Sequence, residues 1–269
     1  MRAVMTLESK QSSKAEKRRK KIIELTQARG NVSVEFLTDW LDVSPQTVRR
    51  DLKQLCSENL LRRRHGGVEC FEQQLNAPYD LRAATNPVEK KAIANAVADV
   101  IPDGATVFIS IGSTPAIVAE ALANKSGLTV MTNNLNAAMV LSNEPSNRII
   151  IPGGEVRMPD RDILGDGVLE FFNSYRAEYG IFGVAGVSED GGLLDFHASE
   201  VRVREAIRTH CKTSILVMDS TKLTRTAPAV GGNLMDVDLI IMDQHPGDDF
   251  SSISDRVGDR LKLVGGDAS

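Results

Sequence analysis

The chain has 269 residues, a formal net charge of −4 and 42% hydrophobic residues, enough for one large or two ordinary domains with buried cores. Its three cysteines, Cys56, Cys70 and Cys211, include no close pair, and its four histidines show no ligand spacing. This excludes a disulfide framework and a zinc site, and we expect no cofactor. No run of about 18 apolar residues is present, and residues 1–11 lack the apolar core of a signal peptide, so we expect a cytoplasmic protein.

The charges are unevenly distributed along the chain. Residues 1–69 carry 15 Lys and Arg against 9 Asp and Glu, whereas the remaining residues carry 17 against 27. A basic N-terminal part before an acidic remainder is expected when only one end of a chain approaches a polyanion such as DNA. Residues 1–15, rich in Ser, Gln and Lys, are expected to be disordered.

Residues 16–70 are predicted to form a winged helix-turn-helix domain. A basic helix is expected over residues 17–29, and Gly30 is placed to end it. Ser33 can cap a second helix, and residues 42–43 give the short turn before a third. Helix, helix, tight turn and basic helix is the order of a DNA-binding helix-turn-helix.

The third helix has the features of a DNA-recognition helix. Ser44 is a good N-cap, and Pro45 falls at the first helical position, where its missing N–H costs nothing. Val48, Leu52 and Leu55 recur at helical spacing and should form the buried stripe. Arg suits guanine and Gln suits adenine, and either also binds phosphates. The predicted DNA-binding side chains of this helix are Gln46, Thr47, Arg49, Arg50 and Lys53.

A β-wing is predicted to follow the recognition helix. A short apolar run at residues 60–61 leads into a cationic run and then the turn Gly66-Gly67. Such a hairpin lays cations along a phosphate backbone. The predicted DNA-binding residues of the wing are Arg62, Arg63, Arg64 and His65. For His65, a hydrogen bond to phosphate and simple exposure both stay open.

The alternative for this segment is a small three-helix bundle whose arginines form only a solvated face. The capped start of the third helix, the short turn before it and the basic wing argue together against that alternative. We therefore expect operator double-stranded DNA as a partner of the N-terminal domain.

The rest of the chain is predicted to be a linker at residues 71–87, an α/β domain at 88–255 and a C-terminal tail at 256–269. Helices are expected at residues 90–100, 116–123, 137–141 and 200–210. Strands are expected at residues 105–109, 128–131, 148–151, 180–187, 214–218 and 237–242. Apolar strands without alternation, separated by amphipathic helices, predict a parallel sheet covered on both faces.

Polar turns follow several of the predicted strands, at residues 110–114, 132–134, 152–155 and 219–222. Ligands of open α/β sheets bind outside the carboxyl ends of the strands, so these turns are expected to converge on one pocket. Ser110-Ile111-Gly112-Ser113-Thr114 opens a helix, and backbone N–H groups at a helix start attract anions. Lys222 adds a positive charge.

Each of these motifs also has a simpler explanation. A Gly-Ser-Thr turn is often only a connection, Glu200 and Arg204 can form an ordinary helix surface pair, and Asn133-Asn134 can be a cap. The recurrence of polar turns after successive strands favours a pocket for a phosphate or phosphosugar.

From about residue 17 to residue 244, the chain resembles the DeoR family of bacterial sugar-responsive repressors. The resemblance rests on Ser44-Pro45-Gln46-Thr47-Val48-Arg49-Arg50-Asp51-Leu52 and on the wing at residues 61–67. In the sensor part it rests on Gly-Ser-Thr-Pro at 112–115, Thr-Asn-Asn-Leu-Asn at 132–136, Gly-Gly-Glu-Val-Arg at 153–157, Gly-Leu-Leu-Asp-Phe at 192–196 and Glu-Val-Arg at 200–202. These sensor motifs are most similar to the subfamily that responds to glycerol-3-phosphate.

The resemblance implies a C-terminal sensor domain related to ribose-5-phosphate isomerase-like phosphosugar binders. It also implies a homo-oligomer, dimer or tetramer, that a phosphorylated effector (glycerol-3-phosphate or a sugar phosphate) releases from its operator. The implied effector-binding residues are Gly112, Ser113, Thr114, Thr132, Asn133, Gly153, Gly154, Glu200, Arg204, Ser220 and Lys222. The chain departs from the family at Ser110, where an acid is usual, at Arg204, where Lys is common, and at residues 223–225, where Phe-Gly-Arg is common.

These features predict a transcriptional repressor of sugar or glycerol catabolism genes and no enzymatic activity. Two alternatives stay open. A phosphosugar isomerase with a regulatory head would need a positioned acid or base, for which Asp195, Glu200 and Lys222 are the candidates. An activator is not separated from a repressor by the sequence, because the sign of regulation depends on operator position.

Overall fold

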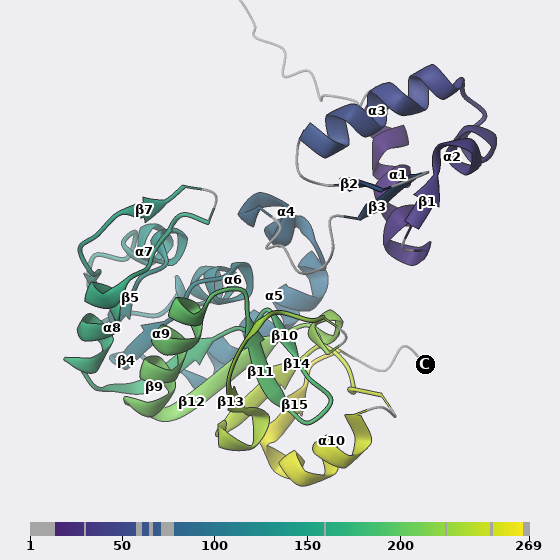
Figure 1. Ribbon diagram of the computed structural model, residues 1–269. Coiled ribbons are helices and arrows are strands. Elements are labelled where there is room, and N and C mark those ends of the chain that lie inside the picture. The colour runs from purple at the N-terminus through teal and green to yellow at the C-terminus, as the bar shows by residue number, and fades with distance from the viewer. Residues whose placement is uncertain are drawn as a thin grey trace, which may run out of the picture. The chain divides into compact units, whose positions relative to one another are not determined.

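The structure, a computed structural model, describes residues 14–29, 31–57, 61–64, 67–70, 78–158, 160–223, 225–247 and 250–265. The chain divides into two compact units, residues 1–75 and 76–269, here called the head and the body (Figure 1). Of residues 1–15, for which disorder is expected, residues 1–13 lie outside the described residues, as does His65, whereas Lys14 and Ala15 belong to the first helix of the head.

The head combines three helices with a three-stranded antiparallel sheet in its described residues. Its elements are α1 (Lys14–Arg29), β1 (Asn31–Ser33), α2 (Val34–Leu41), α3 (Pro45–Ser57), β2 (Leu61–Arg64) and β3 (Gly67–Cys70). The sheet order is β1-β3-β2, so the predicted wing is the β2–β3 hairpin. Ser33 caps α2 by accepting from Phe36 N at 3.1 Å. The winged helix-turn-helix prediction is confirmed.

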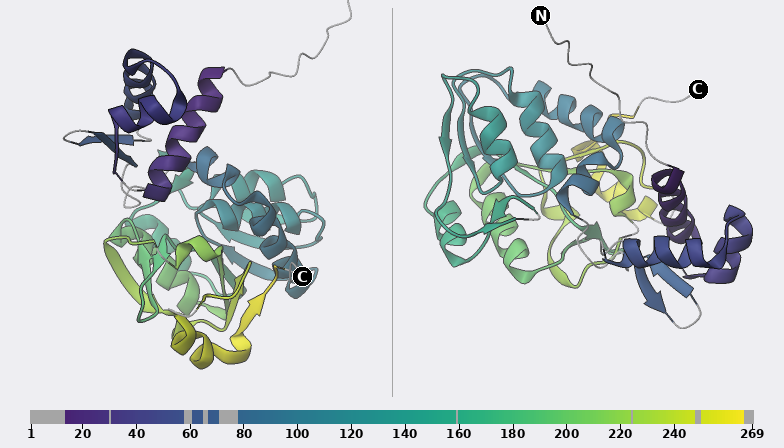
Figure 2. Two further views of the ribbon diagram at one scale, coloured as in Figure 1. Left: turned by 90° about the vertical axis from the view of Figure 1, so that its right-hand side faces the viewer. Right: turned by 90° about the horizontal axis from the view of Figure 1, so that it is seen from above.

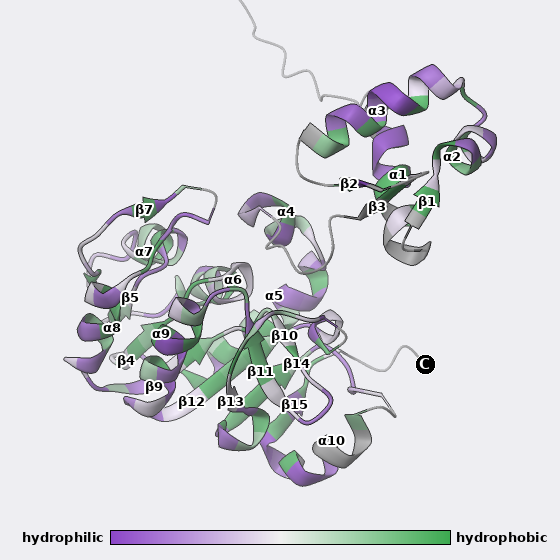
Figure 3. Cartoon of the chain, viewed as in Figure 1, coloured by the Kyte–Doolittle hydropathy of each residue, from purple (hydrophilic) through white to green (hydrophobic). Residues whose placement is uncertain are grey.

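The recognition helix α3 begins as its sequence predicts. Ser44 Oγ accepts a hydrogen bond from Thr47 N at 3.3 Å, which satisfies one N–H of the first turn. Val48, Leu52 and Leu55 are at most 2% exposed and pack with Ile22 in the core of the head. The two sides of α3 therefore differ in polarity, as Figure 3 shows along the helix.

The body is built on a seven-stranded parallel sheet, as predicted. Its strand order is β15-β14-β12-β9-β4-β5-β6, and each neighbouring pair is parallel. The strands are β4 (Thr106–Ile109), β5 (Thr129–Thr132), β6 (Arg148–Ile150), β9 (Ala177–Phe182), β12 (Cys211–Met218), β14 (Leu239–Met242) and β15 (Leu261–Leu263). The central strands β9 and β12 are apolar and buried toward their carboxyl ends, whereas Glu178 and Lys212 near their starts are exposed.

Helices cover both faces of this sheet (Figure 2), which explains why its strands do not alternate. Val107 and Ile109 of β4 share one core with α5 (Pro87–Val100), α6 (Ser113–Leu122) and α7 (Leu135–Leu141). Phe108, between them, shares the other core with α8 (Asp166–Asn173) and α9 (Ala198–Thr209). Its ring meets that of Phe172 edge-on at 5.3 Å between centroids.

One predicted strand is wrong, because the apolar run at residues 180–187 forms two strands in two sheets. β9 ends at Phe182, the chain leaves the large sheet at Gly183, and β10 (Gly186–Val187) starts a small antiparallel sheet with β11 (Gly192–Asp195) and β13 (Ala229–Asn233). A side chain at Gly186 would collide with Arg225 O, 1.9 Å from its Cβ position. The residues before and after this break are all apolar and buried, so the hydropathy of the sequence gives no sign of it.

Two segments outside the predicted domain have regular structure. The predicted linker contains α4 (Tyr79–Ala84), and Tyr79 is 8% exposed. The predicted C-terminal tail contains β15, which pairs with β14 and completes one edge of the sheet. Both are too short for a periodic signal, so only their packing identifies them.

Two further elements, which lie between α4 and β15 in the sequence, were not predicted either. They are the hairpin of β7 (Val156–Arg157) and β8 (Asp162–Ile163), and helix α10 (Ser251–Val257). Within the described residues, no helix is long and apolar enough to cross a membrane.

Candidate functional site

Helix α3 presents a polar, cationic face to solvent. Gln46, Arg49, Arg50 and Lys53 are exposed, and Thr47 is half-buried with its Oγ1 2.9 Å from Ser44 Oγ. Guanidinium and amide groups on one helix face match the base edges of the major groove and the phosphates beside it.

The wing contributes further cations to the head. Arg63 of β2 is exposed, Arg62 and Arg64 belong to the same strand, and their side chains, like His65, lie outside the described residues. The backbone of the hairpin pairs Arg64 with Gly67, so the turn between the two strands is short. A run of Arg on such a hairpin is suited to phosphate contacts.

The acidic residue of α3 is turned away from its cationic face. Asp51 is 2% exposed and accepts a hydrogen bond from Arg18 Nε of α1 at 2.5 Å. Arg19 of α1 also donates to Gln54 Oε1 at 2.7 Å. These two contacts fix α3 on α1, and the burial of Asp51 keeps a negative charge off the exposed face.

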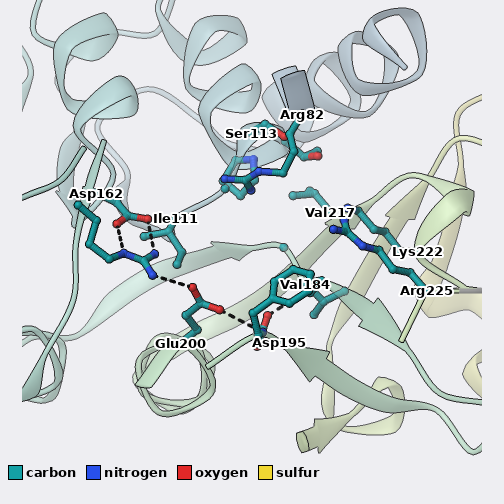
Figure 4. Close-up of a pocket in the computed structure, with 17 residues that line it drawn as sticks. Arg82, Ile111, Ser113, Asp162, Val184, Asp195, Glu200, Val217, Lys222 and Arg225 are labelled. Atoms are coloured by element: carbon teal, nitrogen blue, oxygen red, sulfur yellow. Dashed lines mark hydrogen bonds and ion pairs between the residues drawn. The ribbon is translucent and has the colours of Figure 1, made fainter. Parts of the chain in front are cut away.

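The body contains a cleft at the carboxyl ends of β4, β9 and β12 (Figure 4). Including its open mouth, it encloses about 570 Å³ of space that protein atoms do not fill. The lining residues are Arg82, Ile111, Gly112, Ser113, Thr114, Pro115, Arg157, Asp162, Gly183, Val184, Ala185, Asp195, Phe196, Glu200, Val217, Lys222 and Arg225.

The turn between β4 and α6 forms one wall of the cleft. Gly112 has a φ of +114°, and an added Cβ would lie 3.3 Å from Pro115 Cδ, so glycine fits this position best. Asn134 Nδ2 donates to Ser110 O and Gly112 O, both at 3.1 Å, and holds the turn. The N–H groups of the first turn of α6 therefore begin at the cleft, where they favour an anion.

Cationic side chains surround this turn. Arg82 of α4 lies close to Ser113 in Figure 4, and Lys222 and Arg225, which follow β12, come from the neighbouring side. Burial lowers the pKa of Lys222 from its ordinary 10.5 to about 7, and the charges of Arg225, Lys90 and Arg82 add to this effect against Asp219. A bound anion would offset this repulsion and favour the charged ammonium.

Carboxylates form the opposite wall of the cleft. Arg157 donates to both oxygens of Asp162 at 2.7 and 2.8 Å and to Glu200 Oε1 at 3.0 Å, so all three of its nitrogens are engaged (Figure 4). Asp195 accepts from Arg204 Nε at 2.9 Å. Burial raises the pKa of Asp195 to about 6, although Arg204 favours the charged form. This wall offers acceptor oxygens that suit hydroxyl groups.

Glu200 is fixed by the start of α9. Its Oε2 accepts from the backbone N–H groups of Phe196 and His197, each at 3.2 Å, while Oε1 meets Arg157. This is the capping-box arrangement, in which the third residue of a helix reaches back to its N-cap. The carboxylate is thus held in place before any ligand arrives.

The structure brings five of the eleven predicted effector residues to the cleft: Gly112, Ser113, Thr114, Glu200 and Lys222. Gly153 and Gly154 are exposed beyond β6 and do not line it. Two of the four polar turns, those after β4 and β12, therefore reach the cleft.

The other four predicted residues do not line the cleft and instead make hydrogen bonds within the body. Thr132 Oγ1 donates to Ile109 O at 2.7 Å, and Asn133 Nδ2 donates to Ile163 O at 2.8 Å, both from fully buried positions. Arg204 is 2% exposed and donates hydrogen bonds to Asp195, Glu205 and the carbonyl oxygen of Gly231. Ser220 bonds to Asp243.

Five charged residues of the cleft were not predicted as effector contacts: Arg82, Arg157, Asp162, Asp195 and Arg225. Arg157 is the last residue of the Gly-Gly-Glu-Val-Arg motif. Arg225 is the last residue of Leu-Thr-Arg, the segment where Phe-Gly-Arg is common in the family. The sequence therefore points to both segments. Asp195 was considered only as a possible catalyst. Arg82 had no signal, because its segment reads as a linker.

The chain matches two family models. Residues 18–74 match "DeoR-like helix-turn-helix domain" and residues 85–244 match "DeoR C terminal sensor domain". Among curated relatives, the "Glycerol-3-phosphate regulon repressor" of Escherichia coli (strain K12) is 44% identical over 84% of this chain and 89% of its own. The protein of that name from Haemophilus influenzae is 41% identical over 85% and 89%, and the "HTH-type transcriptional repressor CsqR" of Escherichia coli (strain K12) is 37% identical over 85% and 88%.

Solved structures give weaker likenesses. A D-ribose-5-phosphate isomerase in complex with phospho-erythronic acid has a TM-score of 0.35 and 17% identity over 51% of this chain and 53% of its own. Translation initiation factor eIF-2B of Pyrococcus horikoshii OT3 has a TM-score of 0.43 and 14% identity over 81% and 74%. The α/β fold of the body is established by its own parallel sheet and by the match to the sensor-domain family.

Proposed function

We propose that this chain, which belongs to the DeoR family of transcriptional repressors, is released from its operator DNA by glycerol-3-phosphate. The head binds double-stranded DNA, and the body binds the effector in the cleft. The observation that carries the proposal is the division of the cleft into a cationic wall and a carboxylate wall. Relatives named for the glycerol-3-phosphate regulon support the choice of effector.

The cationic wall suits a phosphate group. The first turn of α6 at Ser113 and Thr114 supplies backbone donors, and Arg82, Lys222 and Arg225 supply positive charge. A phosphate monoester carries about −1.5 to −2 charges at pH 7 and three acceptor oxygens. Unphosphorylated glycerol lacks this group and should not release the operator.

The carboxylate wall suits the hydroxyl groups of a neutral polyol. Asp162 and Glu200 keep acceptor capacity beside Arg157, which donates one hydrogen bond from each of its three nitrogens to them. A second anionic group on the ligand would meet Asp195, Glu200 and Asp162, and their charges would repel it. We therefore expect phosphorylated polyols to bind better than phosphorylated acids such as 3-phosphoglycerate.

The head is proposed to read the operator through Gln46, Arg49, Arg50 and Lys53. All four are exposed on one helix whose acidic residue, Asp51, is buried. The wing residue Arg63 is proposed to bind phosphates, together with Arg62, Arg64 and His65.

We also propose that the chain self-associates into a dimer or tetramer, as the family resemblance implies. Sedimentation equilibrium of the full chain measures this.

A phosphosugar isomerase is a second candidate. The lowered pKa of Lys222 and the raised pKa of Asp195 are of the kind found at acid/base catalysts. A phosphate-binding role accounts for the cluster of cations equally well, and the curated relatives are named repressors. Turnover of ribose-5-phosphate or a hexose phosphate by the full chain, lost in Lys222→Met, would favour the enzyme.

The deciding experiment measures operator release by fluorescence anisotropy. The full chain is bound to labelled operator and titrated with glycerol, glycerol-3-phosphate, 3-phosphoglycerate and several hexose phosphates. We expect release by glycerol-3-phosphate and none by glycerol. Release by a hexose phosphate but not by glycerol-3-phosphate would contradict the effector while leaving the repressor function intact.

A further inference from the structure

We propose that Asp160 competes with the phosphate group of the effector for Arg82, so that effector binding detaches helix α4 from the β7–β8 hairpin. This inference rests on the proposed effector site. Helix α4 is the first element of the body, directly after the undescribed residues 71–77 that follow β3 of the head. A change in its attachment therefore acts at the point where the chain passes from the head to the body.

Arg82 serves two regions at once. Its side chain lines the cleft, and its Nη2 donates to Asp160 Oδ1 in the turn between β7 and β8. The two side chains are 15% and 14% exposed, so the pair is partly shielded from water. When Arg82 leaves, Asp160 keeps a cation nearby, because its Oδ2 lies 3.9 Å from Arg157 Nη2. The exchange thus leaves no buried charge alone.

The backbone of α4 is tied to the same site. Lys90 Nζ donates to the carbonyl oxygen of Arg82 and lies 3.5 Å from Ser113 Oγ in the turn that opens α6. Lys90 is 3% exposed, so this link is buried. A phosphate at Ser113 would take the third N–H of this ammonium and would lie beside the link to the last turn of α4.

The effector phosphate has the electrostatic advantage over Asp160. A carboxylate carries one negative charge, whereas a phosphate monoester carries up to two, with three acceptor oxygens. In the cleft the phosphate would also lie among Lys222 and Arg225, whose charges repel that of Arg82 in the empty site. The guanidinium of Arg82 therefore gains more by turning toward the ligand than it loses at Asp160.

A second ion pair between the same two elements provides a matched control. Arg161 Nη2 lies 3.1 Å from Asp80 Oδ1, which also joins the β7–β8 turn to α4. These side chains are 50% and 77% exposed and do not line the cleft. Such an exposed pair contributes little, and removing it leaves Arg82 unchanged.

The test measures binding of glycerol-3-phosphate and of inorganic phosphate to the full chain by titration calorimetry. We expect Asp160→Asn to bind both ligands about tenfold more tightly, because Arg82 no longer leaves a charged partner. Asp80→Asn should stay within about twofold of the wild type. In an Arg82→Ala background, the gain from Asp160→Asn should disappear.

Hydrogen exchange gives an independent readout of the attachment. Amides of residues 79–84 should exchange faster when glycerol-3-phosphate is bound to the wild type. Equal affinity in Asp160→Asn and the wild type, weaker binding by a folded Asp160→Asn, or slower exchange in α4 would each overturn the inference. If the wild type binds neither ligand, the proposed function fails and the inference with it, whereas the other outcomes concern the inference alone.

Discussion

Effector affinity should fall as the pH rises above 7, because Lys222 in the cleft loses its charge as the pH passes through about 7. Burial lowers the pKa of Lys222 to about 7 in the empty site. A bound phosphate favours the ammonium and raises this pKa, so the complex takes up a proton when it forms above pH 7. Affinity is therefore greatest when Lys222 is already charged, and it declines as free protein loses that proton.

The size of the effect follows from the separation between the two pKa values. If the complex holds Lys222 charged up to pH 9, affinity should be about 11-fold weaker at pH 8, and about 100-fold weaker at pH 9, than it would be with Lys222 fully charged in the free protein. The phosphate loses its second proton near pH 6, so its charge is nearly constant over this range. Below pH 6 that protonation lowers affinity again, which gives an optimum between about pH 6 and 7.

Titration calorimetry with glycerol-3-phosphate from pH 6 to 9 measures this dependence, and buffers of different ionisation enthalpy count the protons taken up. Lys222→Arg is the matched control, because arginine stays charged throughout and should flatten the profile. Lys222→Met should bind weakly at every pH. A wild-type profile that is flat from pH 7 to 9, or one that Lys222→Arg leaves unchanged, would refute this account.

Five further substitutions test the head and the phosphate turn. Arg49→Ala and Arg50→Ala should each weaken operator binding by about 1–3 kcal/mol, whereas Arg63→Ala should weaken specific and non-specific binding alike and flatten the salt dependence; unchanged operator affinity in both recognition-helix variants would contradict the assignment. Ser113→Asp should abolish release by glycerol-3-phosphate while operator binding survives, and normal release would show that the phosphate lies elsewhere. Ser44→Ala should lower the free energy of unfolding by about 1 kcal/mol in denaturant titrations, and no change would mean that its hydrogen bond contributes nothing.

Local signals in the sequence predict much of the fold. Ser44 and Pro45 mark the start of α3, since a cap and a first-turn proline act on the neighbouring backbone alone. The consecutive apolar residues Val107, Phe108 and Ile109 predict a strand buried on both faces, because neighbouring residues of a strand point to opposite sides. Such features depend on neighbours within a few residues and are therefore visible in the chain itself.

Only part of the predicted set of effector residues lines the cleft, because polar turns that look similar in the sequence lie at different places in the fold. The turns after β4 and β5 are both polar in sequence, with hydroxyl side chains in the first and a hydroxyl and two amides in the second. In the structure Ser113 and Thr114 line the cleft, whereas Thr132 and Asn133 are fully buried and bond to neighbouring backbone. Strand order places β4 beside β9 in the middle of the sheet, and β5 one position further out.

The sequence by itself determined the recognition helix, the wing, the parallel sheet and the turn at Ser113, because capping, hydrophobic periodicity and helix-start chemistry act over a few residues. Only the tertiary structure decided which charges share the cleft. Arg82, Arg157 and Lys222 come from segments 65 residues or more apart, and no local pattern relates them. Long-range packing of α4, the β7–β8 hairpin and the end of β12 brings their charges together. Burial, with the charges of Arg225, Lys90 and Arg82, lowers the pKa of Lys222.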